Sequence, residues 1–392
     1  MADRILILGA SARAAAASAR RAGFTPFAVD LFADRDTQIL CERVWRCPFD
    51  RYPEGLFELA KHAPPMPWMY TGGLENYPEL VGELAKEREL WGNGPEVLKR
   101  VRDPFELSSI LSMKGLAHPE PRRSGETLDP AKRWLRKPIC GSGGFGIRVV
   151  LKNEQSEPSA DYYFQEFIPG PPMSAVFTAT RSNPRMFSFC SQLIGTPWLH
   201  AKDFQYAGNL GPVKVEGCDI QDVYLSGFRL VDRVRMTGIF GVDFIPHADA
   251  SYIIEVNPRY TASVEVHELT TGISAIRESQ SLAFDSDRGL TPLARQSIVG
   301  KAIYYAPHRI TFPASGPWDE SLSHVLDVWR RPDFADIPHP GDIIEAGQPV
   351  ITILTEADTE SACLARLQSR AAELDRLFGF SPSPRTVDAH DE

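Results

Sequence analysis

Residues 241–259, which read GVDFIPHADASYIIEVNPR, constrain this chain more than any other segment. Two apolar, β-branched runs flank a short polar turn at His247–Ser251, a pattern that predicts a β-hairpin. Asp243 falls on the first predicted strand. Glu255 and Asn257 are two residues apart on the second, so they share one face. Pairing of the strands is expected to bring the three oxygen-bearing side chains together.

This small set of hard oxygen ligands, with Arg259 beside it, suits Mg²⁺ that carries the phosphates of a nucleotide. An exposed, charged hairpin without a ligand fits the same residues equally well. The choice between the two interpretations therefore depends on other parts of the chain.

A glycine-rich segment lies about a hundred residues upstream, where residues 134–150 read WLRKPICGSGGFGIRVV. Lys137 lies on a strand-like run, and glycines leave backbone N–H groups open to an anion. Because a second strand-like run follows, the segment is neither a P-loop nor the start of a dinucleotide-binding helix. A plain turn remains the alternative. Next, residues 162–170 (YYFQEFIPG) predict a strand that ends at Gln165 and Glu166. A carboxylate at this position can accept a hydrogen bond from the amino group of adenine.

The order of these three features resembles the ATP-grasp superfamily over roughly residues 100–275, and the sequence E-V-N-P-R is the most specific part of the likeness. The resemblance implies ATP and Mg²⁺ as cofactors. It assigns the phosphates to Lys137 and the loop of Gly141, Ser142, Gly143, Gly144 and Gly146, and the adenine to Glu166, Phe167 and Ile168. It assigns Mg²⁺ to Asp243, Glu255 and Asn257, and catalysis to Arg259 and Lys137.

One position departs from the superfamily pattern. Members usually carry an earlier Asp-Lys pair, whereas this chain has Asp103-Pro104. The first nucleotide lysine is therefore missing, and Arg100, Arg102 or Lys114 would have to replace it.

The composition is that of an ordinary globular protein, with 43% hydrophobic and 24% charged residues and a net charge of −9. This charge favours neither a nucleic-acid nor a membrane partner. No window reaches the roughly 18 apolar residues of a membrane span. The apolar N-terminal run continues directly into an Arg/Ala-rich helix, unlike a signal peptide. Six cysteines without C-x-x-C spacing predict neither a zinc site nor disulfides. The expected compartment is the cytoplasm.

The expected fold class is α/β (α+β): an ATP-grasp fold with an N-terminal Rossmann-like domain and a small C-terminal β-rich subdomain. Residues 1–98 begin as a βαβ unit, 99–280 form the ATP-grasp core, 281–380 the β-rich subdomain, and 381–392 a Pro/Ser-rich, acidic tail expected to be disordered. Residues 341–349 (GDIIEAGQP) resemble the hairpin of biotinyl modules but lack a Met-Lys-Met acceptor, so they cannot carry biotin.

Two segments are candidates for substrate binding. Gly72 and Gly73 end an apolar strand and precede Glu75, Asn76 and a predicted helix, whose N-terminal N–H groups suit an anion. A simple βα turn is the alternative. Residues 197–212 lack clear periodicity. They fit either a loop in which Lys202 and Tyr206 contact a substrate or a purely structural loop.

Three further expectations concern side chains outside this set. Helical spacing predicts that Val223, Phe228, Leu230, Val231 and Val234 pack in the core. His267, which lies between Glu265 and Glu268, has the chemistry of a base, but near a helix start it is more typical of a cap or surface group. Cys140 fits a half-buried packing residue better than a redox-sensitive thiol.

The resemblance implies an ADP-forming ligase that joins a small carboxylate to an amine or thiol through an acyl phosphate, and it is compatible with a homodimer. A non-catalytic nucleotide-binding regulatory protein is the alternative, because of the missing lysine. A phosphate-transferring enzyme without ligation is a further possibility. A biotin carboxylase fits less well, because its R-x-Q-V-E-H segment is replaced by RYTASVEVHE.

Within the superfamily, the segments YTGGLEN, E-V-N-P-R-Y and G-D-x-I-x-x-G-Q-P resemble predicted carboligases related to biotin carboxylase. Some of those accompany methanopterin-linked one-carbon genes. The resemblance thus suggests a substrate in methanopterin or methylofuran biosynthesis.

Overall fold

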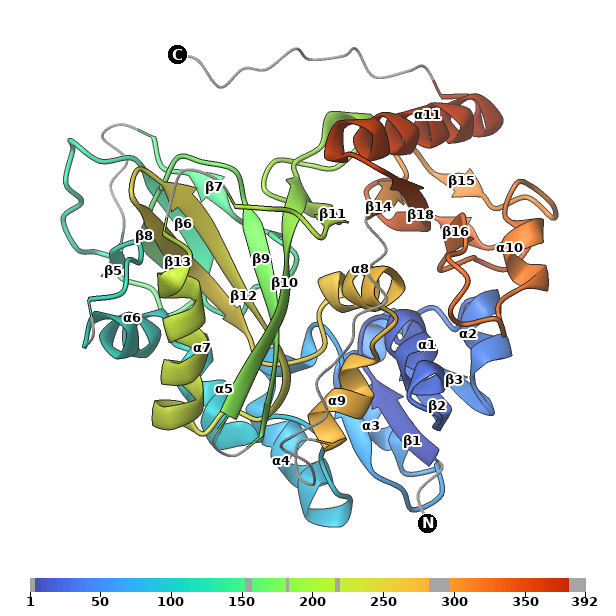
Figure 1. Cartoon of the computed structure of the whole chain (residues 1–392), viewed down its shortest axis with the longest axis horizontal. Helices are drawn as coiled ribbons and strands as arrows, with labels where there is room; N and C mark the ends of the chain where they lie inside the picture. The colour runs from blue at the N-terminus through green and yellow to red at the C-terminus, as the bar shows by residue number, and fades with distance from the viewer. Residues whose placement is uncertain are drawn as a thin grey trace.

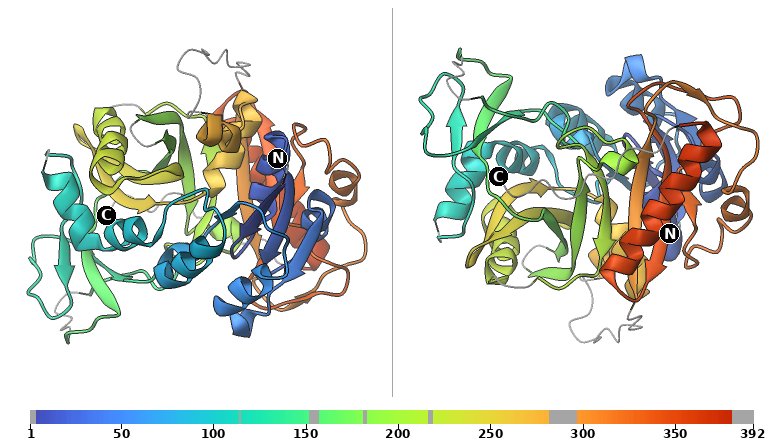
Figure 2. Two further views of the ribbon diagram at one scale, coloured as in Figure 1. Left: turned by 90° about the horizontal axis from the view of Figure 1, so that it is seen from below. Right: turned by 90° about the horizontal axis from the view of Figure 1, so that it is seen from above.

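The computed structural model describes residues 4–113, 115–151, 157–180, 183–215, 219–281 and 297–380. A large sheet runs through the middle of the molecule (Figure 1). A small sheet with its helices lies at one end, and the N-terminal and C-terminal elements lie together at the other (Figure 2).

The N-terminal elements form the predicted βαβ start. The run RILIL is almost wholly buried and pairs in parallel with two neighbours, giving the sheet order β3-β2-β1-β4. Parallel strands buried on both faces read as continuous apolar runs, which explains the composition of this segment. The elements are β1 (Arg4–Leu8), α1 (Arg13–Arg21), β2 (Thr25–Asp30), α2 (Arg35–Leu40), β3 (Arg43–Arg46), η1 (Phe49–Arg51), α3 (Glu54–Ala60), β4 (Trp68–Tyr70), η2 (Leu74–Asn76) and α4 (Pro78–Glu87).

Two helices lead from this sheet to the small antiparallel sheet β5-β8-β6-β7. Pro104 is the first residue of the second helix, where its missing N–H costs nothing. The Asp103 carboxylate accepts the N–H groups of Phe105 (2.8 Å) and Glu106 (3.1 Å) as a helix cap. The elements are α5 (Pro95–Arg102), α6 (Pro104–Ser112), β5 (Pro121–Arg123), β6 (Trp134–Pro138), β7 (Arg148–Val149) and β8 (Tyr162–Glu166).

The large sheet has the order β13-β12-β9-β10-β11-β14-β18-β16, so the predicted C-terminal region contributes its last three strands. The elements are β9 (Met173–Thr180), β10 (Asn183–Ile194), η3 (Pro197–Leu199), β11 (Tyr206–Gly211), α7 (Gln221–Val234), β12 (Gly238–His247), β13 (Ala250–Asn257), α8 (Ala262–Thr271), α9 (Ala275–Ser281), β14 (Ile298–Tyr305), β15 (Ile310–Thr311), α10 (Asp319–Ser323), β16 (Phe334–Ala335), β17 (Ile343–Ile344), β18 (Pro349–Ala357) and α11 (Glu360–Phe378).

The prediction for α7 was correct for four side chains and wrong for Phe228. Val223, Leu230, Val231 and Val234 are buried against the large sheet, whereas Phe228 is 50% exposed. Helical spacing gave the right face, but Phe228 lies beyond the edge of the buried stripe.

No helix in the described ranges is long and apolar enough to cross a membrane. The predicted tail, residues 381–392, lies outside the described residues.

Candidate active site

The predicted hairpin is formed by β12 and β13, which pair antiparallel. Asp243 lies directly opposite Glu255, next to a register shift between Asp243 and Phe244. The Asn257 side chain donates to Oδ2 of Asp243 at 2.8 Å. Two carboxylates and an amide therefore lie at one end of the hairpin, and their oxygen atoms are of the kind that Mg²⁺ prefers.

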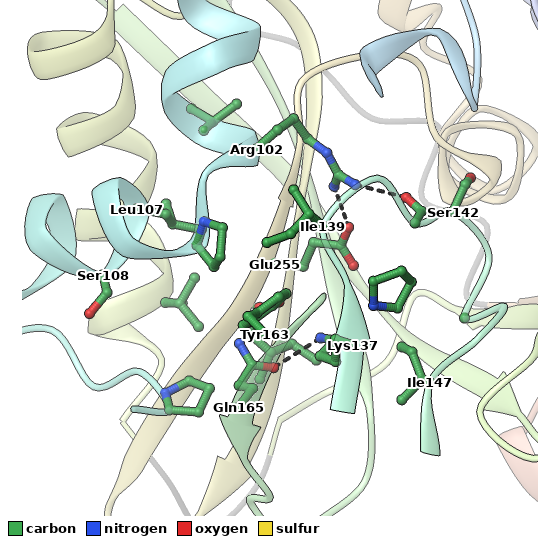
Figure 3. Close-up of a pocket in the computed structure, with 18 of the residues that line it drawn as sticks. Arg102, Leu107, Ser108, Lys137, Ile139, Ser142, Ile147, Tyr163, Gln165 and Glu255 are labelled. Atoms are coloured by element: carbon green, nitrogen blue, oxygen red, sulfur yellow. Dashed lines mark hydrogen bonds and ion pairs between the residues drawn. The ribbon is translucent and has the colours of Figure 1, made fainter. Parts of the chain in front are cut away.

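Cationic side chains from other elements surround this end of the hairpin. Arg102, the last residue of α5, pairs with Oε1 of Glu255 at 2.5 Å (Figure 3). Arg259 pairs with Oε1 of Glu75 at 2.7 Å and also donates to Oδ1 of Asn257 at 3.1 Å. The N-terminal region therefore reaches the hairpin through Glu75.

The two facing carboxylates differ in proton affinity. Burial, with the neighbouring charge of Glu255, raises the pKa of Asp243 from 3.8 to about 7. Burial also acts to raise the pKa of Glu255, but Arg102, Lys137 and Arg259 outweigh it, and the net pKa is lowered. The side chain of Glu255 is 37% exposed.

The glycine-rich segment connects β6 and β7 and lies against the hairpin. Lys137 is buried on β6, and its ammonium group donates to the side chain of Gln165 at 2.9 Å. The carbonyl of Gly141 accepts from Arg102 at 2.8 Å and from Asn76 at 3.3 Å. On the other side, the carbonyl of Gly143 accepts from the backbone N–H of Tyr206 at 3.0 Å. The loop is held closed from both sides.

Glycine is required at one position of this loop. Gly144 has a φ of +79°, and a Cβ atom there would lie 1.8 Å from the carbonyl oxygen of Phe204. Gly146 has the same φ, but its nearest neighbour would be Pro138 at 3.5 Å. The first glycine allows close approach of two backbones, and the second supplies only conformational freedom.

The cavity beneath the loop has a volume of about 70 Å³, little more than the share of two water molecules in the liquid. Its walls include Lys137, Gln165 and Glu255 together with residues 141–145 and Ile147. Since a nucleotide is much larger, the loop would have to open to admit one. Figure 3 shows Arg102 and Lys137 pointing into this space from different elements.

The three residues predicted at the adenine do not line this cavity. Glu166 pairs with Lys132 at 3.2 Å, the ring of Phe167 lies under the guanidinium of Arg133, and Ile168 is buried. Their neighbour Gln165 is the residue of this segment that forms part of the wall.

The predicted substrate residues fall into two places. Gly72 lies beside the guanidinium of Arg259, and Gly73, with a φ of +100°, starts the turn that carries Glu75 and Asn76. Tyr206 is joined to the glycine loop. Lys202 is exposed, and a Cβ atom at Gly347 would lie 3.6 Å from its Nζ, so it belongs to the side of the C-terminal region.

Of the three cations considered as replacements for the missing lysine, Arg102 lies in the site. Arg100 bonds to Glu106 at 2.5 Å and to the carbonyl of Arg233 at 2.7 Å, away from the cavity. Lys114 lies outside the described residues. Sequence reasoning missed Gln192, whose side chain donates to Asp243 at 3.1 Å from near the end of β10. No sequence signal marks it, because its role depends on strand pairing.

Two other expectations were wrong. His267 is neither a cap nor a surface group: it is 2% exposed within α8, its ring contacts that of Phe187, and burial lowers its pKa to about 3. Helix α8 packs between α1 and the large sheet, so both of its faces are covered. Cys140 is exposed rather than half-buried, because it lies on the outer side of the loop.

Within the described residues, no group of three or more His, Cys, Asp or Glu side chains is arranged to hold a metal ion. The hairpin set has two carboxylates, and its third member is an amide.

Comparison with known proteins places this geometry in context. Residues 101–263 match the sequence model of the ATP-grasp domain. Over 91% of its length, the chain is 23% identical to an uncharacterised protein of Methanocaldococcus jannaschii, of which it covers 89%.

Solved structures share the fold over nearly the whole chain. An L-amino acid ligase from Bacillus licheniformis superposes with a TM-score of 0.63 at 15% identity, covering 94% of this chain and 97% of that one. The biotin carboxylase domain of the Hydrogenobacter thermophilus 2-oxoglutarate carboxylase, solved with MgADP, ADP and bicarbonate, superposes with a TM-score of 0.66 at 13% identity, covering 93% and 88%.

Proposed function

We propose that this chain, whose residues 101–263 match the ATP-grasp domain, is an ATP- and Mg²⁺-dependent ligase that joins a small carboxylic acid to an amine. The observation that carries the proposal is the end of the β12–β13 hairpin. Two facing carboxylates and an amide lie there beside Lys137, Arg102, Arg259 and a closed glycine loop.

The chemistry of the donor set fits Mg²⁺. Asp243 faces a second carboxylate while partly buried, and the resulting repulsion is what a divalent cation between them would relieve. Asp243, Glu255 and Asn257 would hold the ion, and its positive charge would offset the negative charge of the phosphates.

The chain's own residues would bind and orient the reactants. Lys137 would direct its ammonium group to the phosphates in place of Gln165, and the free N–H groups of the loop would add further donors. Arg259 is held by Glu75 and Asn257, so its guanidinium is already oriented toward the hairpin. Closure of the loop would exclude water from an intermediate that water would hydrolyse.

The proposed reaction has two steps. A carboxylate oxygen attacks the γ-phosphorus of ATP, the bond to the β-phosphate oxygen breaks, and ADP leaves with the electron pair. The amine nitrogen then attacks the carbonyl carbon of the acyl phosphate, releasing phosphate and a proton and forming the amide. A thiol acceptor would follow the same course.

The rival functions have less support. A biotin carboxylase needs its glutamate at the site, whereas Glu265 is fully buried against Arg13 and Lys301. A non-catalytic nucleotide-binding protein is favoured by Pro104, which replaces the usual lysine, but Arg102 places a cation beside Glu255. The suggested place in methanopterin or methylofuran biosynthesis rests on resemblance alone. We therefore include precursors of these cofactors among the acids to test, and cytoplasmic location and a homodimer remain part of the proposal.

Calorimetric titration with ADP, with and without Mg²⁺, tests the nucleotide site. Wild type should bind in the presence of Mg²⁺, and Lys137→Met should bind about tenfold more weakly, because one charge-assisted contact is lost. Lys86→Met, an exposed lysine of α4, is the matched control and should bind as wild type does.

Turnover distinguishes a ligase from a non-catalytic protein. Release of ADP from ATP that depends on both an acid and an amine supports ligation. Failure of wild type to bind either nucleotide contradicts the proposal, and binding without turnover across an acid and amine panel favours the regulatory alternative.

A further inference from the structure

Gln192 reaches the candidate metal ligand Asp243 from a strand that is not adjacent to it. In the large sheet, β9 runs between β12, which carries Asp243, and β10, which carries Gln192 (Figure 1). Neighbouring strands lie about 4.8 Å apart, so the two side chains together span about 10 Å between their backbones. Nε2 of Gln192 nevertheless donates to Oδ1 of Asp243 at 3.1 Å. A bond across a whole strand requires a long side chain, and glutamine supplies both the length and the donor.

Ser174 is the residue of β9 directly beside Asp243. It pairs with Asp243 in β12 and with Cys190 in β10, and Cys190 lies two residues before Gln192. All of these side chains therefore point to the same face of the sheet. Ser174 is 3% exposed, and its Oγ has no hydrogen-bond partner in the described ranges. Because serine is small, it leaves room for the side chain of Gln192 to cross β9, and it does not compete for Asp243.

Two amides hold the Asp243 carboxylate, one at each oxygen. Nδ2 of Asn257 donates to Oδ2 at 2.8 Å, and Gln192 donates to Oδ1. The direction of the Asn257 amide is set by Arg259, which donates to its Oδ1 at 3.1 Å, because a guanidinium group has donors only. The nitrogen of Asn257 is thereby turned toward Asp243. Each carboxylate oxygen keeps a further lone pair for a cation.

The backbone of Gln192 is anchored on both sides. Its N–H group donates to the carbonyl of Pro172 at 2.9 Å, and Asn209 lies opposite it in the register of β10 and β11. Gln192 is not part of the wall of the cavity under the glycine loop, so we expect no direct contact with a nucleotide bound there. A side chain that is held on a paired strand and bonded to a metal ligand has the features of a group that orients this ligand.

We propose that Gln192 is a positioning residue for the metal site: together with Asn257, it fixes the orientation of the Asp243 carboxylate before the cation binds. Without Gln192, the carboxylate would keep one donor and would turn more freely about its last torsion, which has broad minima. Loss of a bond of this kind to a metal ligand typically weakens metal binding by about 10- to 100-fold. The inference rests on the proposed function, because it requires Asp243 to hold Mg²⁺.

Gln192→Met removes the donor and nearly keeps the length of the side chain. The Mg²⁺ concentration that gives half-maximal ADP binding, measured by calorimetry, should rise at least about tenfold. At saturating Mg²⁺ the affinity for ADP should return to about that of wild type, because excess metal fills the weakened site. The urea midpoint should stay close to that of wild type. Weaker ADP binding at every Mg²⁺ concentration would indicate a purely structural role and would overturn the proposal.

Two further variants separate the reach of the amide from other effects. Gln192→Asn keeps the amide but is shorter by one methylene group, so the bond across β9 should be lost and the Mg²⁺ requirement should rise as in Gln192→Met. This variant also carries the test if Gln192→Met does not fold. Ser174→Ala is the matched control, because it removes a buried hydroxyl that has no partner among the described residues, and it should bind Mg²⁺ and ADP as wild type does. A wild-type Mg²⁺ requirement in Gln192→Asn would overturn the proposal.

Failure of this inference and failure of the ligase proposal give different results. If wild type binds ADP with Mg²⁺ and Gln192→Met needs no more Mg²⁺ than wild type does, the positioning role is wrong and the nucleotide site stands. If wild type binds no nucleotide, the ligase proposal fails, and titration with Mn²⁺ alone, followed by electron paramagnetic resonance, decides the role of Gln192. Mn²⁺ binding that is about tenfold weaker in Gln192→Met supports this role. Equal Mn²⁺ binding by both proteins, or none by wild type, overturns it.

Discussion

Two ionic clusters of the molecule differ in what their charges can do. At the candidate active site, Arg102 pairs with Glu255, and their side chains are 14% and 37% exposed. Beneath α8, Arg13 and Lys301 both pair with Glu265, and these three side chains are 3%, 6% and 0% exposed. In both clusters, basic side chains pair with a glutamate carboxylate. The first cluster faces a cavity, and the second is surrounded by protein.

This difference separates a binding cluster from a structural one. Glu265 has two cationic partners and no access to solvent, so removal of its charge would leave buried cations short of a partner. Glu255 is solvent-accessible and can exchange Arg102 for an incoming cation at modest cost. Replacing the glutamate by glutamine should therefore lower the stability of the fold at Glu265, and should lower ligand affinity at Glu255.

The largest expected effect is that of Glu265→Gln. This change keeps the shape of the side chain but leaves Arg13 and Lys301 without their shared carboxylate, so the free energy of unfolding should fall by about 3–5 kcal/mol. Asp336 still pairs with Arg13 at 3.1 Å, which places the expected loss at the lower end. Urea unfolding followed by tryptophan fluorescence measures it.

The same substitution at Glu255 is the matched partner of that experiment. Glu255→Gln should leave the urea midpoint near that of wild type and weaken Mg²⁺-dependent ADP binding by roughly 100-fold, about 2.7 kcal/mol. The reason is that an anionic metal ligand becomes a neutral one. Calorimetry gives the affinity. If Glu255→Gln destabilises the fold as much as Glu265→Gln does, the distinction between the two clusters is wrong.

A third substitution tests whether closure of the glycine loop contributes to binding. In Gly144→Ala, the methyl group would meet the carbonyl of Phe204, so the loop cannot take its closed position and ADP affinity should fall about tenfold. Gly146→Ala is the control, because Gly146 has the same φ of +79° and room for a methyl group. Its loss of ADP-binding free energy should be less than half that of Gly144→Ala. Equal losses would mean that backbone strain rather than the contact with Phe204 matters.

Much of the local structure could be predicted from the sequence. The hairpin of β12 and β13 follows from two β-branched runs and a polar turn, and its pairing puts Asp243 opposite Glu255. The βαβ start follows from the apolar run RILIL, since a strand buried on both faces needs no alternation. These features depend on neighbours in the chain, which a sequence displays directly.

Contacts between distant segments could not be predicted in this way. Nothing near Glu265 or His267 in the sequence indicates that α8 is covered on both faces, because Arg13 and Lys301 come from opposite ends of the chain. The contact of Gln192 on β10 could not be predicted either, since only the order of the strands in the sheet brings Gln192 to Asp243. Glu75 and Asn76 were predicted as substrate residues from their turn, and that stays a prediction. Their partners Arg259 and Arg102 are evident only in three dimensions.

The smallest expected effect concerns the pH dependence of stability that a buried carboxyl outside both clusters produces. Burial raises the pKa of Asp30, at the end of β2, from 3.8 to about 6 despite hydrogen bonds from the backbone N–H groups of Ala12, Ala33 and Phe32. The folded protein therefore keeps this proton to a higher pH than the unfolded chain does. Its contribution to stability is complete below about pH 4 and is lost as the pH rises through about 6.

Glu255 and Glu75 have lowered pKa values, so their contribution has the opposite sign and is lost only in acid. Asp30→Asn cannot titrate, so the fall in unfolding free energy between pH 5 and 7 should become shallower by on the order of 1 kcal/mol. Asparagine also replaces one acceptor oxygen by a donor, which shifts stability at every pH. The slope of the unfolding free energy against pH, measured with urea, therefore tests the prediction. The unfolding free energy at a single pH does not. An unchanged slope would mean that Asp30 ionises in the folded protein as readily as in the unfolded chain.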